Sequence, residues 1–205
     1  MTAAILLAGG RATRLGGRDK PRLDVGGRSL LQHALDAVAG CAPVVVGGDA
    51  GTEDAAEGTP VQWVREHPRF AGPAAAVVAG VGALEPAAEQ PEWTVLLACD
   101  LPRAGDAVAR VLRDLPLLPA DVDGVCLGDP TSRPQWLTGA YRTSVLRRAA
   151  AALPSDGADA SMRDLLADLA IAVVAAPAEE TADVDTWDDL EQARARYGGP
   201  DEERA

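Results

Sequence analysis

Aromatic side chains are scarce in this chain, at 3% of its 205 residues. Hydrophobic residues nevertheless make up 47% of the sequence, and alanine and valine are abundant among them. Small aliphatic side chains suit helices that pack closely on a sheet. A chain of this length buries roughly 70% of its unfolded surface on folding. The composition therefore indicates a globular protein that needs no disulfide or metal to stabilise its core.

Positive charge is also scarce. The 19 lysine and arginine residues are opposed by 31 aspartate and glutamate residues, which gives a formal net charge of −12. Proteins that bind duplex DNA or anionic membranes are normally basic. The charge therefore disfavours both nucleic acid and membrane surfaces as partners.

Cysteine is limited to three residues, an odd number without zinc-type pairing. We expect Cys41, Cys99 and Cys126 to be small buried side chains in a reducing compartment. No apolar run approaches the roughly 18 residues of a membrane span. The first ten residues lack the basic segment that begins a signal peptide. These features predict a cytoplasmic protein.

Short aliphatic runs alternate with helix-like stretches along the chain. The expected strands are Ala3–Leu7, Val44–Val46, Val61–Val64, Thr94–Ala98, Gly124–Leu127 and Ile171–Ala175. The expected helices are Leu30–Ala39, Pro73–Leu84, Asp106–Leu115, Thr143–Leu153, Ser161–Leu169 and Thr186–Tyr197. Continuous apolar runs are typical of strands buried on both faces, and their alternation with helices predicts a mostly parallel sheet. We therefore expect an α/β fold, a Rossmann-like three-layer α/β/α sandwich.

The chain has no internal division that marks a second domain. We expect residues 1–197 to form a single domain and residues 198–205 to be a flexible polar tail. Proline, glycine and aspartate are frequent from Leu117 to Trp136, so this stretch is expected to be irregular and to form a flap that faces the substrate. At the last helix, Thr186 and Asp189 have the spacing of a variant capping box.

The most informative segment follows the first expected strand and has the sequence LLAGGRATRLGGRDK, from Leu6 to Lys20. Its glycines allow backbone N–H groups to approach a ligand closely, and successive N–H groups can form an anion-binding nest. Residues 11–28 carry six basic and two acidic groups in an otherwise acidic chain. A surface turn with solvated arginines would contain the same glycines, but the local positive charge favours a site for a small polyphosphate.

Lys20 is the only lysine in the chain, whereas the other 18 basic residues are arginine. The lysine ammonium is a compact charge on a flexible stem, while arginine is a planar fork. Phosphoryl transfer needs a cation that can follow a moving phosphate, so we assign Lys20 to catalysis. The loop is neither a P-loop nor a dinucleotide-binding fingerprint, because neither spacing is present.

A carboxylate follows the buried strand Thr94–Ala98. Asp100 is expected at the carboxyl end of this strand, where open α/β sheets bind ligands. There it can hold Mg²⁺ together with phosphate oxygens, or it can cap the following helix. Asp183 and Asp185 precede the last helix, where they suit either metal binding or the helix dipole.

These segments together resemble the molybdenum cofactor guanylyltransferase family of the nucleotidyltransferase superfamily. The first loop is similar to the signature L-A-G-G-x-S-x-R-M-G-x-D-K, with Ala12 in place of serine, Leu15 in place of methionine and one extra glycine. Further similar segments follow in order along nearly the whole chain: Leu23–Leu31, Gly72-Pro73, Cys99–Pro102, Arg133–Gln135, Tyr141-Arg142 and Asp183–Thr186.

The resemblance implies Mg²⁺-dependent transfer of GMP from GTP to the phosphate of molybdenum cofactor (molybdopterin), with release of pyrophosphate. It implies that Lys20, Arg14 and Asp100 are catalytic and that Asp100 and Asp185 bind the metal. The implied nucleotide-binding residues are Leu7, Ala8, Gly9, Gly10, Lys20, Gly47, Glu66 and Asp100. Transient contact with proteins of molybdoenzyme maturation is also implied.

The donor base depends mainly on one residue of the first loop. Leu-Ala-Gly-Gly resembles the guanine-using branch, whereas cytidine-using relatives more often carry Leu-Ala-Ala-Gly. Gly47 stands where the family often has asparagine, and Glu66 is the nearest counterpart of the usual aspartate, although an exposed turn at Glu66 is equally consistent. The segment G-P-L-A-G appears as Gly72–Ala76. Arg133 is expected either to face the acceptor phosphate or to be solvated.

Two other kinds of protein are consistent with the sequence. The first is a related nucleotidyltransferase, such as a molybdopterin cytidylyltransferase or a guanylyltransferase that acts on phospholactate or a cobamide precursor. The second is a non-catalytic nucleotide-binding protein with the same fold. Lys20 and Asp100 favour catalysis, while Gly47 and the altered Gly72–Ala76 segment are compatible with the non-catalytic protein.

Overall fold

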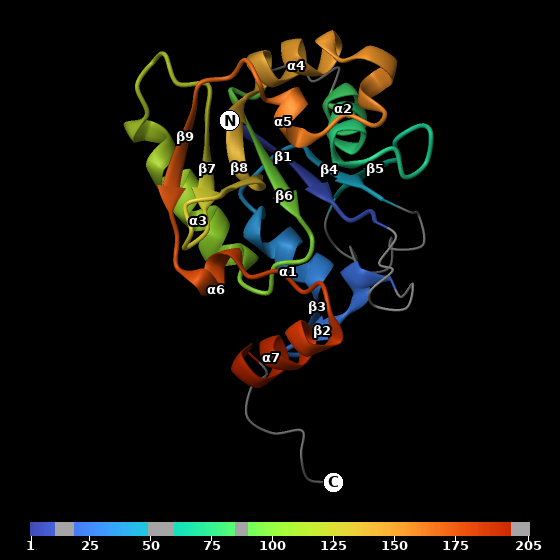
Figure 1. The fold of residues 1–205 in the computed structure, drawn as a ribbon, viewed down its shortest axis with the longest axis vertical. Helices are drawn as coiled ribbons and strands as arrows, with labels where there is room; N and C mark the ends of the chain where they lie inside the picture. Colours follow the sequence, from blue (N-terminus) through green and yellow to red (C-terminus); the bar gives the residue numbers. More distant parts are fainter. Residues whose placement is uncertain (11–18, 49–59, 85–89, 198–205) are drawn as a thin grey trace, which may run out of the picture.

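The computed structural model describes residues 1–10, 19–48, 60–84 and 90–197. Within these residues, seven strands form one sheet in the order β5-β4-β1-β6-β8-β7-β9 (Figure 1). The strands are β1 Thr2–Leu7, β4 Val44–Gly47, β5 Gln62–Val64, β6 Trp93–Ala98, β7 Gly124–Gly128, β8 Pro134–Arg142 and β9 Ile171–Ala175. All six strands expected from the sequence are present, so the predicted α/β sheet is confirmed.

The sheet is mostly parallel, as expected. β1 pairs in parallel with β4 and β6, β4 pairs in parallel with β5, and β7 pairs in parallel with β9. Among the described strands of this sheet, β8 alone runs antiparallel to both of its neighbours, β6 and β7. β8 was not expected, because its sequence mixes polar, aromatic and small residues and forms no continuous aliphatic run. The expectation of an irregular stretch over Leu117–Trp136 is therefore wrong where β8 begins, at Pro134. The strand β7, which was expected, also lies within this stretch.

Helices cover both faces of the sheet. The helices on one face are α1 Leu30–Ala37 and α3 Ala104–Asp114, and those on the other are α2 Pro73–Ala83, α4 Thr143–Ala152 and α5 Met162–Leu165. Two further helices follow β9, α6 Ala178–Thr181 and α7 Trp187–Tyr197. Short 3-10 helices are η2 Lys20–Arg22, η4 Leu115–Leu117 and η5 Pro154–Gly157. The three-layer arrangement is confirmed, although α5 is shorter than the helix expected over Ser161–Leu169.

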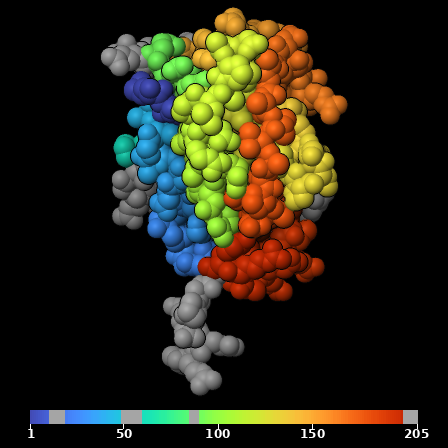
Figure 2. All heavy atoms as spheres, turned by 90° about the vertical axis from the view of Figure 1, so that its left-hand side faces the viewer, coloured from blue at the N-terminus to red at the C-terminus, as the bar shows by residue number. Residues whose placement is uncertain are grey.

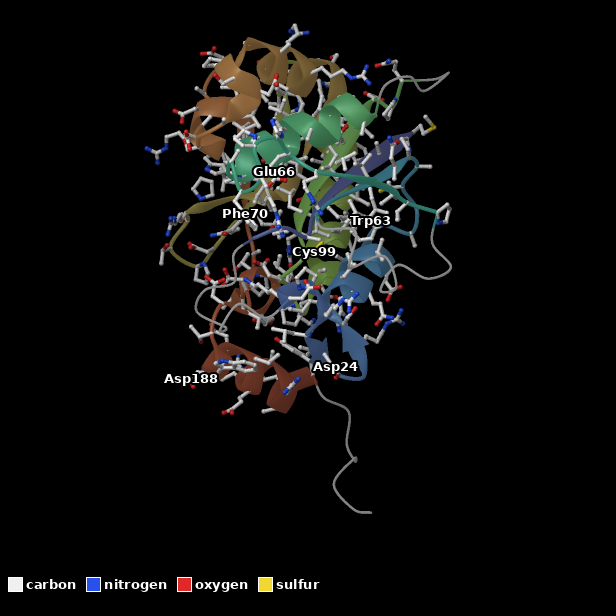
Figure 3. All side chains as sticks on the ribbon, turned by 90° about the vertical axis from the view of Figure 1, so that its right-hand side faces the viewer. Asp24, Trp63, Glu66, Phe70, Cys99 and Asp188 are labelled. Atoms are coloured by element: carbon white, nitrogen blue, oxygen red, sulfur yellow. The ribbon has the colours of Figure 1, made fainter. Side chains whose placement is uncertain are left out.

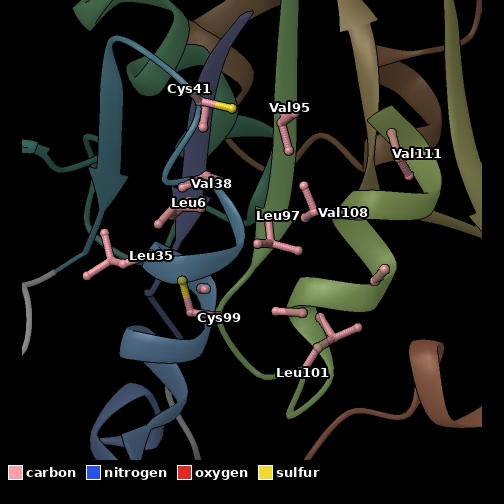
Figure 4. Close-up of a cluster of buried hydrophobic side chains, with 14 of the residues drawn as sticks. Leu6, Leu35, Val38, Cys41, Val95, Leu97, Cys99, Leu101, Val108 and Val111 are labelled. Atoms are coloured by element: carbon pink, nitrogen blue, oxygen red, sulfur yellow. The ribbon is translucent and has the colours of Figure 1, made fainter. Parts of the chain in front are cut away.

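The side chains of β1 alternate between two hydrophobic cores. Ala4 and Leu6 belong to the core under α1 and α3, whereas Ala3 and Ile5 belong to the core under α2, α4 and α5. This alternation arises because successive residues of a strand point to opposite faces. Figure 4 shows the first core, where Leu6 and neighbouring sheet residues meet side chains of α1 and α3. Figure 2 shows the outer side of this layer, with α3 between α1 and β9.

A third, smaller core lies beside the sheet. It contains the hairpin of β2 Asp24–Val25 and β3 Arg28–Ser29, together with α7 (Figure 1). Val25 and Leu190 are both fully buried in it. This core packs the β2–β3 hairpin, which follows Lys20, against α7, which follows Asp185. The single domain over residues 1–197 stays a prediction, and the predicted tail at 198–205 lies outside the described residues.

The three cysteines are free and buried, as expected. Burial raises the pKa of the Cys126 thiol to about 12, and it raises the pKa of the Cys99 thiol as well. A thiol in such surroundings stays protonated and is not a nucleophile. In the part of the chain that the structure describes, no helix is long and apolar enough to cross a membrane.

The packing of β8 generates a test of the sheet. A Cβ atom at Gly139 would lie 2.6 Å from the Val125 carbonyl oxygen and 2.9 Å from the Cys126 Cβ atom. We expect Gly139→Ala to lower the free energy of unfolding by about 1–3 kcal/mol, because the backbone must shift to relieve this contact. Gly82→Ala on α2 is the control, since its Cβ would meet nothing within 4 Å. Helix propensity predicts a gain of up to about 1 kcal/mol for that control. Urea unfolding measures both, and a Gly139→Ala protein as stable as wild type would contradict the close packing of β8 on β7.

Candidate active site

The glycine pair Gly9-Gly10 follows β1, the strand that lies between β4 and β6. The Leu7 carbonyl oxygen accepts a hydrogen bond from the Cys99 N–H at 3.0 Å, and the Ala8 N–H donates to the Gly47 carbonyl oxygen at 2.8 Å. Ala8 is buried, whereas Gly9 and Gly10 are exposed. Gly10 has a φ of 152°, which favours glycine. The chain thus leaves the sheet after Ala8, and the backbone of the two glycines is accessible at the carboxyl edge of the sheet.

Gly47 ends β4 directly beside this point. A Cβ atom on Gly47 would lie 3.6 Å from the Leu6 carbonyl oxygen, and one on Gly48 would lie 3.3 Å from the Ala8 Cβ atom. The Gly48 N–H also donates to the Val64 carbonyl oxygen at 3.0 Å. Gly47 therefore offers a ligand only its backbone, and the strand end carries no side chain that could contact a base.

Lys20 reaches two carboxylates from distant parts of the chain. Its Nζ atom lies 2.9 Å from Asp100 Oδ2 and 2.6 Å from Asp185 Oδ1. The Lys20 side chain is only 18% exposed. Its burial disfavours the charged ammonium, but the charge of Asp100 and the hydrogen bonds to Asp185 and Asp100 raise the pKa of Lys20 overall. Lys20 is therefore a charged ammonium at neutral pH.

Asp100 follows β6 and points to this cluster instead of capping α3. The residue before α3 is Arg103, and no side chain caps that helix. The capping role considered for Asp100 is therefore wrong. The backbone of Asp100 also contributes, because its carbonyl oxygen accepts a hydrogen bond from the Val184 N–H at 3.0 Å. This bond holds the chain on either side of Val184 against the end of β6.

Asp183 and Asp185 flank Val184 and complete an acidic cluster with Asp100. Carboxylate oxygens of the three residues lie within 4.8 Å of one another. The Asp183 side chain is exposed, but desolvation by the surrounding protein and the negative charges of Asp100 and Asp185 raise its pKa. Three carboxylates and one ammonium leave two formal negative charges in the cluster. A donor set of carboxylate oxygens with this charge fits a hard divalent cation such as Mg²⁺.

The start of α7 holds the backbone of Asp185 in place. Asp189 Oδ2 accepts hydrogen bonds from the Thr186 N–H at 2.8 Å and from the Asp185 N–H at 3.1 Å. The Thr186 hydroxyl in turn accepts a hydrogen bond from the Asp189 N–H at 3.2 Å. The capping box expected from Thr186 and Asp189 is therefore confirmed, and it also orders Asp185.

Glu66 lies in the loop between β5 and α2 (Figure 3). Its Oε1 atom accepts a hydrogen bond from the Phe70 N–H at 2.9 Å, and Phe70 has a φ of 63°. Glu66 thus closes a local turn, which agrees with the exposed turn considered from the sequence. Its role in base binding stays a prediction. Arg14, also predicted to belong to the site, lies outside the described residues.

An open pocket of about 510 Å³ lies beside Asp100 and Asp183. Arg133, Gln135 and Thr138 line it from β8 and the turn before β8. Asp129 orders that turn, because its Oδ1 atom accepts hydrogen bonds from the Thr131 N–H at 2.8 Å and from the Arg133 N–H at 3.0 Å. Gln135 was noted from the sequence only as part of a segment similar to the family, without a role, and Thr138 was not identified, since β8 was not expected. Arg133 was expected either to face the acceptor phosphate or to be solvated; it lies in the pocket lining and is exposed, and its role stays a prediction.

The sequence matches one family model, described as the MobA-like NTP transferase domain, over residues 4–175. The chain is 40% identical over 155 residues to the molybdenum cofactor guanylyltransferase of Bradyrhizobium sp. (strain ORS 278), covering 69% of this chain and 63% of that protein. It is 37% identical over 109 residues to the molybdenum cofactor guanylyltransferase of Pseudomonas putida (strain GB-1), covering 53% of this chain and 54% of that protein. The matched segments therefore span less than two thirds of either relative.

Solved structures share the fold over almost the whole chain. The molybdopterin-guanine dinucleotide biosynthesis protein A of Archaeoglobus fulgidus superposes with a TM-score of 0.68 at 16% identity, covering 96% of this chain and 98% of that chain. A nucleotidyl transferase of Methanothermobacter thermautotroptrophicus superposes with a TM-score of 0.72 at 20% identity, covering 96% and 97%. At these identities the likeness establishes the fold alone.

The capping box predicts a pH dependence of stability. The hydrogen bond from the Thr186 hydroxyl, followed by those from the backbone of Thr186 and Asp185, lowers the pKa of Asp189 below its ordinary value of 3.8. A carboxyl group with a lowered pKa stabilises the fold above its unfolded pKa, and this contribution is lost as the pH falls through the folded pKa. We expect wild type to be more stable than Asp189→Asn above pH 3.8, with the difference shrinking below it. Thermal unfolding across this pH range measures the difference, and a pH-independent difference would contradict the lowered pKa.

Proposed function

We propose that this chain, which belongs to the family of MobA-like NTP transferase domains, transfers GMP from GTP to the phosphate of molybdenum cofactor with the help of Mg²⁺. The observation that carries the proposal is the contact of Lys20 with two of three clustered carboxylates at the carboxyl edge of the sheet. Ligands of open α/β sheets bind at this edge. The identity to named guanylyltransferases supports GMP as the transferred group.

The donor triphosphate binds at the first loop. The Ala8 N–H is already paired with Gly47, so contact with phosphate oxygens falls to the backbone N–H groups of Gly9 and Gly10. Both glycines are exposed and carry no side chain that would keep the phosphates at a distance. Lys20 supplies the positive charge beside them, and its four-carbon stem lets the ammonium move from the carboxylates to a phosphate oxygen.

Asp100, Asp183 and Asp185 would hold the metal ion. Mg²⁺ at these carboxylates would neutralise charge on the phosphoryl group that is transferred. The three carboxylates would fix the position of the ion relative to the glycine loop. Asp100 does so from the sheet, while the Val184 hydrogen bond holds the other two carboxylates against it.

The acceptor enters by the pocket beside Asp100. An oxygen of its phosphate attacks the α-phosphorus of GTP, the bond from that phosphorus to the β-phosphate oxygen breaks, and pyrophosphate leaves. A phosphate monoester has a second pKa near 6 and is largely a dianion at neutral pH, so no general base is required. Arg133 lines the pocket and offers a positive charge to this phosphate. Catalysis then depends on positioning and charge.

The reaction is proposed to take place in the cytoplasm. The acidic composition and the three free, buried cysteines support this setting. GTP and molybdenum cofactor are the proposed ligands. Contact with proteins that carry the product to molybdoenzymes is a further part of the proposal.

Lys20 is the residue whose loss tests the mechanism most directly. We expect Lys20→Ala to lower the rate of pyrophosphate release by about 100-fold or more, because one preorganised charge at the reacting phosphate is removed. Arg22→Ala is the matched control, since Arg22 lies in the same 3-10 helix and its side chain is 46% exposed. Arg22→Ala is expected to stay near the wild-type rate. A Lys20→Ala protein with wild-type turnover would remove Lys20 from the mechanism.

The donor is identified by thermal unfolding with GTP, CTP, ATP and UTP, each with and without Mg²⁺. A ligand at 100 times its Kd stabilises the native state by about 2.7 kcal/mol, which raises the midpoint by several degrees in a chain of this size. We expect a clear shift with GTP and Mg²⁺ and a smaller shift when the metal is omitted. A shift with CTP alone would support nucleotidyl transfer but identify CTP as the donor in place of GTP. A shift with none of the four would contradict the proposed function.

A further inference from the structure

The chain that carries Asp183 and Asp185 runs from the edge of the sheet to its middle. It leaves the edge strand β9 at Ala175 and reaches the end of β6, where the Val184 N–H donates to the Asp100 carbonyl oxygen. On the way it forms α6, which packs beside α3 (Figure 1). Residues 176–185 are called the carboxylate arm below.

Glu180 attaches the carboxylate arm to α3. Arg110 Nε donates to Glu180 Oε2 at 2.6 Å, and an Nη atom of Arg110 donates to Glu180 Oε1 at 2.7 Å. Glu180 is only 8% exposed. A guanidinium that binds both oxygens of a carboxylate defines orientation as well as distance. The pair therefore determines how α6 sits on α3.

Two backbone hydrogen bonds hold the ends of the arm. The Ala176 N–H donates to the Gly128 carbonyl oxygen at 3.1 Å, and the Val184 N–H donates to Asp100 at 3.0 Å. Between these ends, Arg110 and Glu180 form the hydrogen-bonded ion pair that attaches the arm to α3 among the described residues. Glu180 stands three residues before Asp183. In the part of the arm between β9 and Asp183, it is therefore the attached residue nearest to that carboxylate.

Asp183 requires an attachment of this kind, because its carboxylate is held among like charges. Its oxygens lie within 4.8 Å of those of Asp100 and Asp185. Carboxylates at this distance repel each other, which favours movement of the arm away from Asp100. Asp185 has a second restraint in the capping box of α7, where its N–H donates to Asp189. Asp183 has the Val184 hydrogen bond on its other side but no capping box, so on the side of β9 the described residues offer the attachment at Glu180 to hold it.

We propose that the Arg110–Glu180 ion pair positions the metal site by holding the carboxylate arm so that Asp183 stays within reach of Asp100. The proposal rests on the proposed function, because it concerns the metal ligands of that reaction. Arg110 and Glu180 are positioning residues. Arg110 lies on α3 and Glu180 in α6, and neither is proposed to contact the metal or a phosphate, so the pair acts through the arm.

The test replaces the pair without leaving a buried charge unpaired. Truncating one partner would strand the other and unfold the protein locally, whereas two apolar residues of similar volume often preserve stability. The variant is Arg110→Met/Glu180→Leu. The control is Arg142→Met/Glu92→Leu, which removes an ion pair of 3.3 Å and the hydrogen bond from Arg142 to the Val122 carbonyl oxygen, at the other end of β6 from Asp100. Both double variants leave the net charge unchanged.

The probe is Mn²⁺, titrated into the full chain without nucleotide and followed by the electron paramagnetic resonance signal of the free ion. Loss of a residue that orients metal ligands typically weakens metal binding by 10- to 100-fold. We expect the Kd for Mn²⁺ to rise by roughly 10-fold in Arg110→Met/Glu180→Leu and to stay at the wild-type value in the control. The apparent Mg²⁺ requirement of pyrophosphate release should rise in parallel, while kcat recovers toward wild type at saturating Mg²⁺.

Several outcomes would overturn the proposal. An unchanged Kd in Arg110→Met/Glu180→Leu would do so, and so would equal weakening in both double variants, which would point to a general loss of stability. A wild-type chain that binds no Mn²⁺ would also overturn it. The proposed function is judged separately by the rate of Mg²⁺-dependent pyrophosphate release in wild type, so the two can fail independently.

A second pair of variants covers the case in which the double variant does not fold. Glu180→Gln keeps the size of the side chain and one oxygen acceptor for Arg110, and Glu92→Gln removes the same charge from the control pair. Glu180→Gln is expected to weaken Mn²⁺ binding relative to Glu92→Gln, by less than the double variant. Equal Kd values for the two single variants would overturn the proposal.

Discussion

The contact of Lys20 with Asp100 and Asp185 joins the parts of the molecule on which the site depends. Asp100 stands at the end of a central strand, Asp185 stands just before the last long helix, and Lys20 begins the turn that leads into the β2–β3 hairpin. The small core between the hairpin and α7 also holds the segment after Lys20 against the segment after Asp185. Opposite charges in a half-buried place attract more strongly than on the surface. The ion pairs therefore hold three distant segments at one point.

The sheet explains why this point lies where it does. β1, β4 and β6 are parallel neighbours, so their carboxyl ends meet at one edge. At or just after the end of each strand stands a residue suited to an anionic ligand or its cation. Gly9 and Gly47 leave the backbone uncovered, and Asp100 adds a carboxylate. Both faces of these strands are buried in hydrophobic cores, which makes the edge a rigid support for the site.

The chemistry that such an edge supports is based on charge. The cysteines are buried and protonated, and the cluster consists of one ammonium and three carboxylates. A reaction between a phosphate and a nucleotide needs this kind of group, because the nucleophile is already ionised. The pocket that β8 helps to line lies directly beside the cluster, so in the proposed reaction the acceptor and the donor would approach from neighbouring sides.

The sequence by itself determined six strands, most of the helices, the glycine loop and the candidates Lys20, Asp100 and Asp185, since hydrophobic runs, glycine and isolated charges are local signals. It did not reveal β8, because a strand of mixed polarity in the middle of a sheet owes its structure to neighbours that are distant in the chain. Only the tertiary structure decided that Asp100 faces Lys20 instead of capping α3, and that Asp183 joins the same cluster. It also decided that Glu66 closes a turn and that Glu180 is tied to Arg110. These contacts join residues through space, and their formation depends on how the strands and helices pack, which no local pattern records.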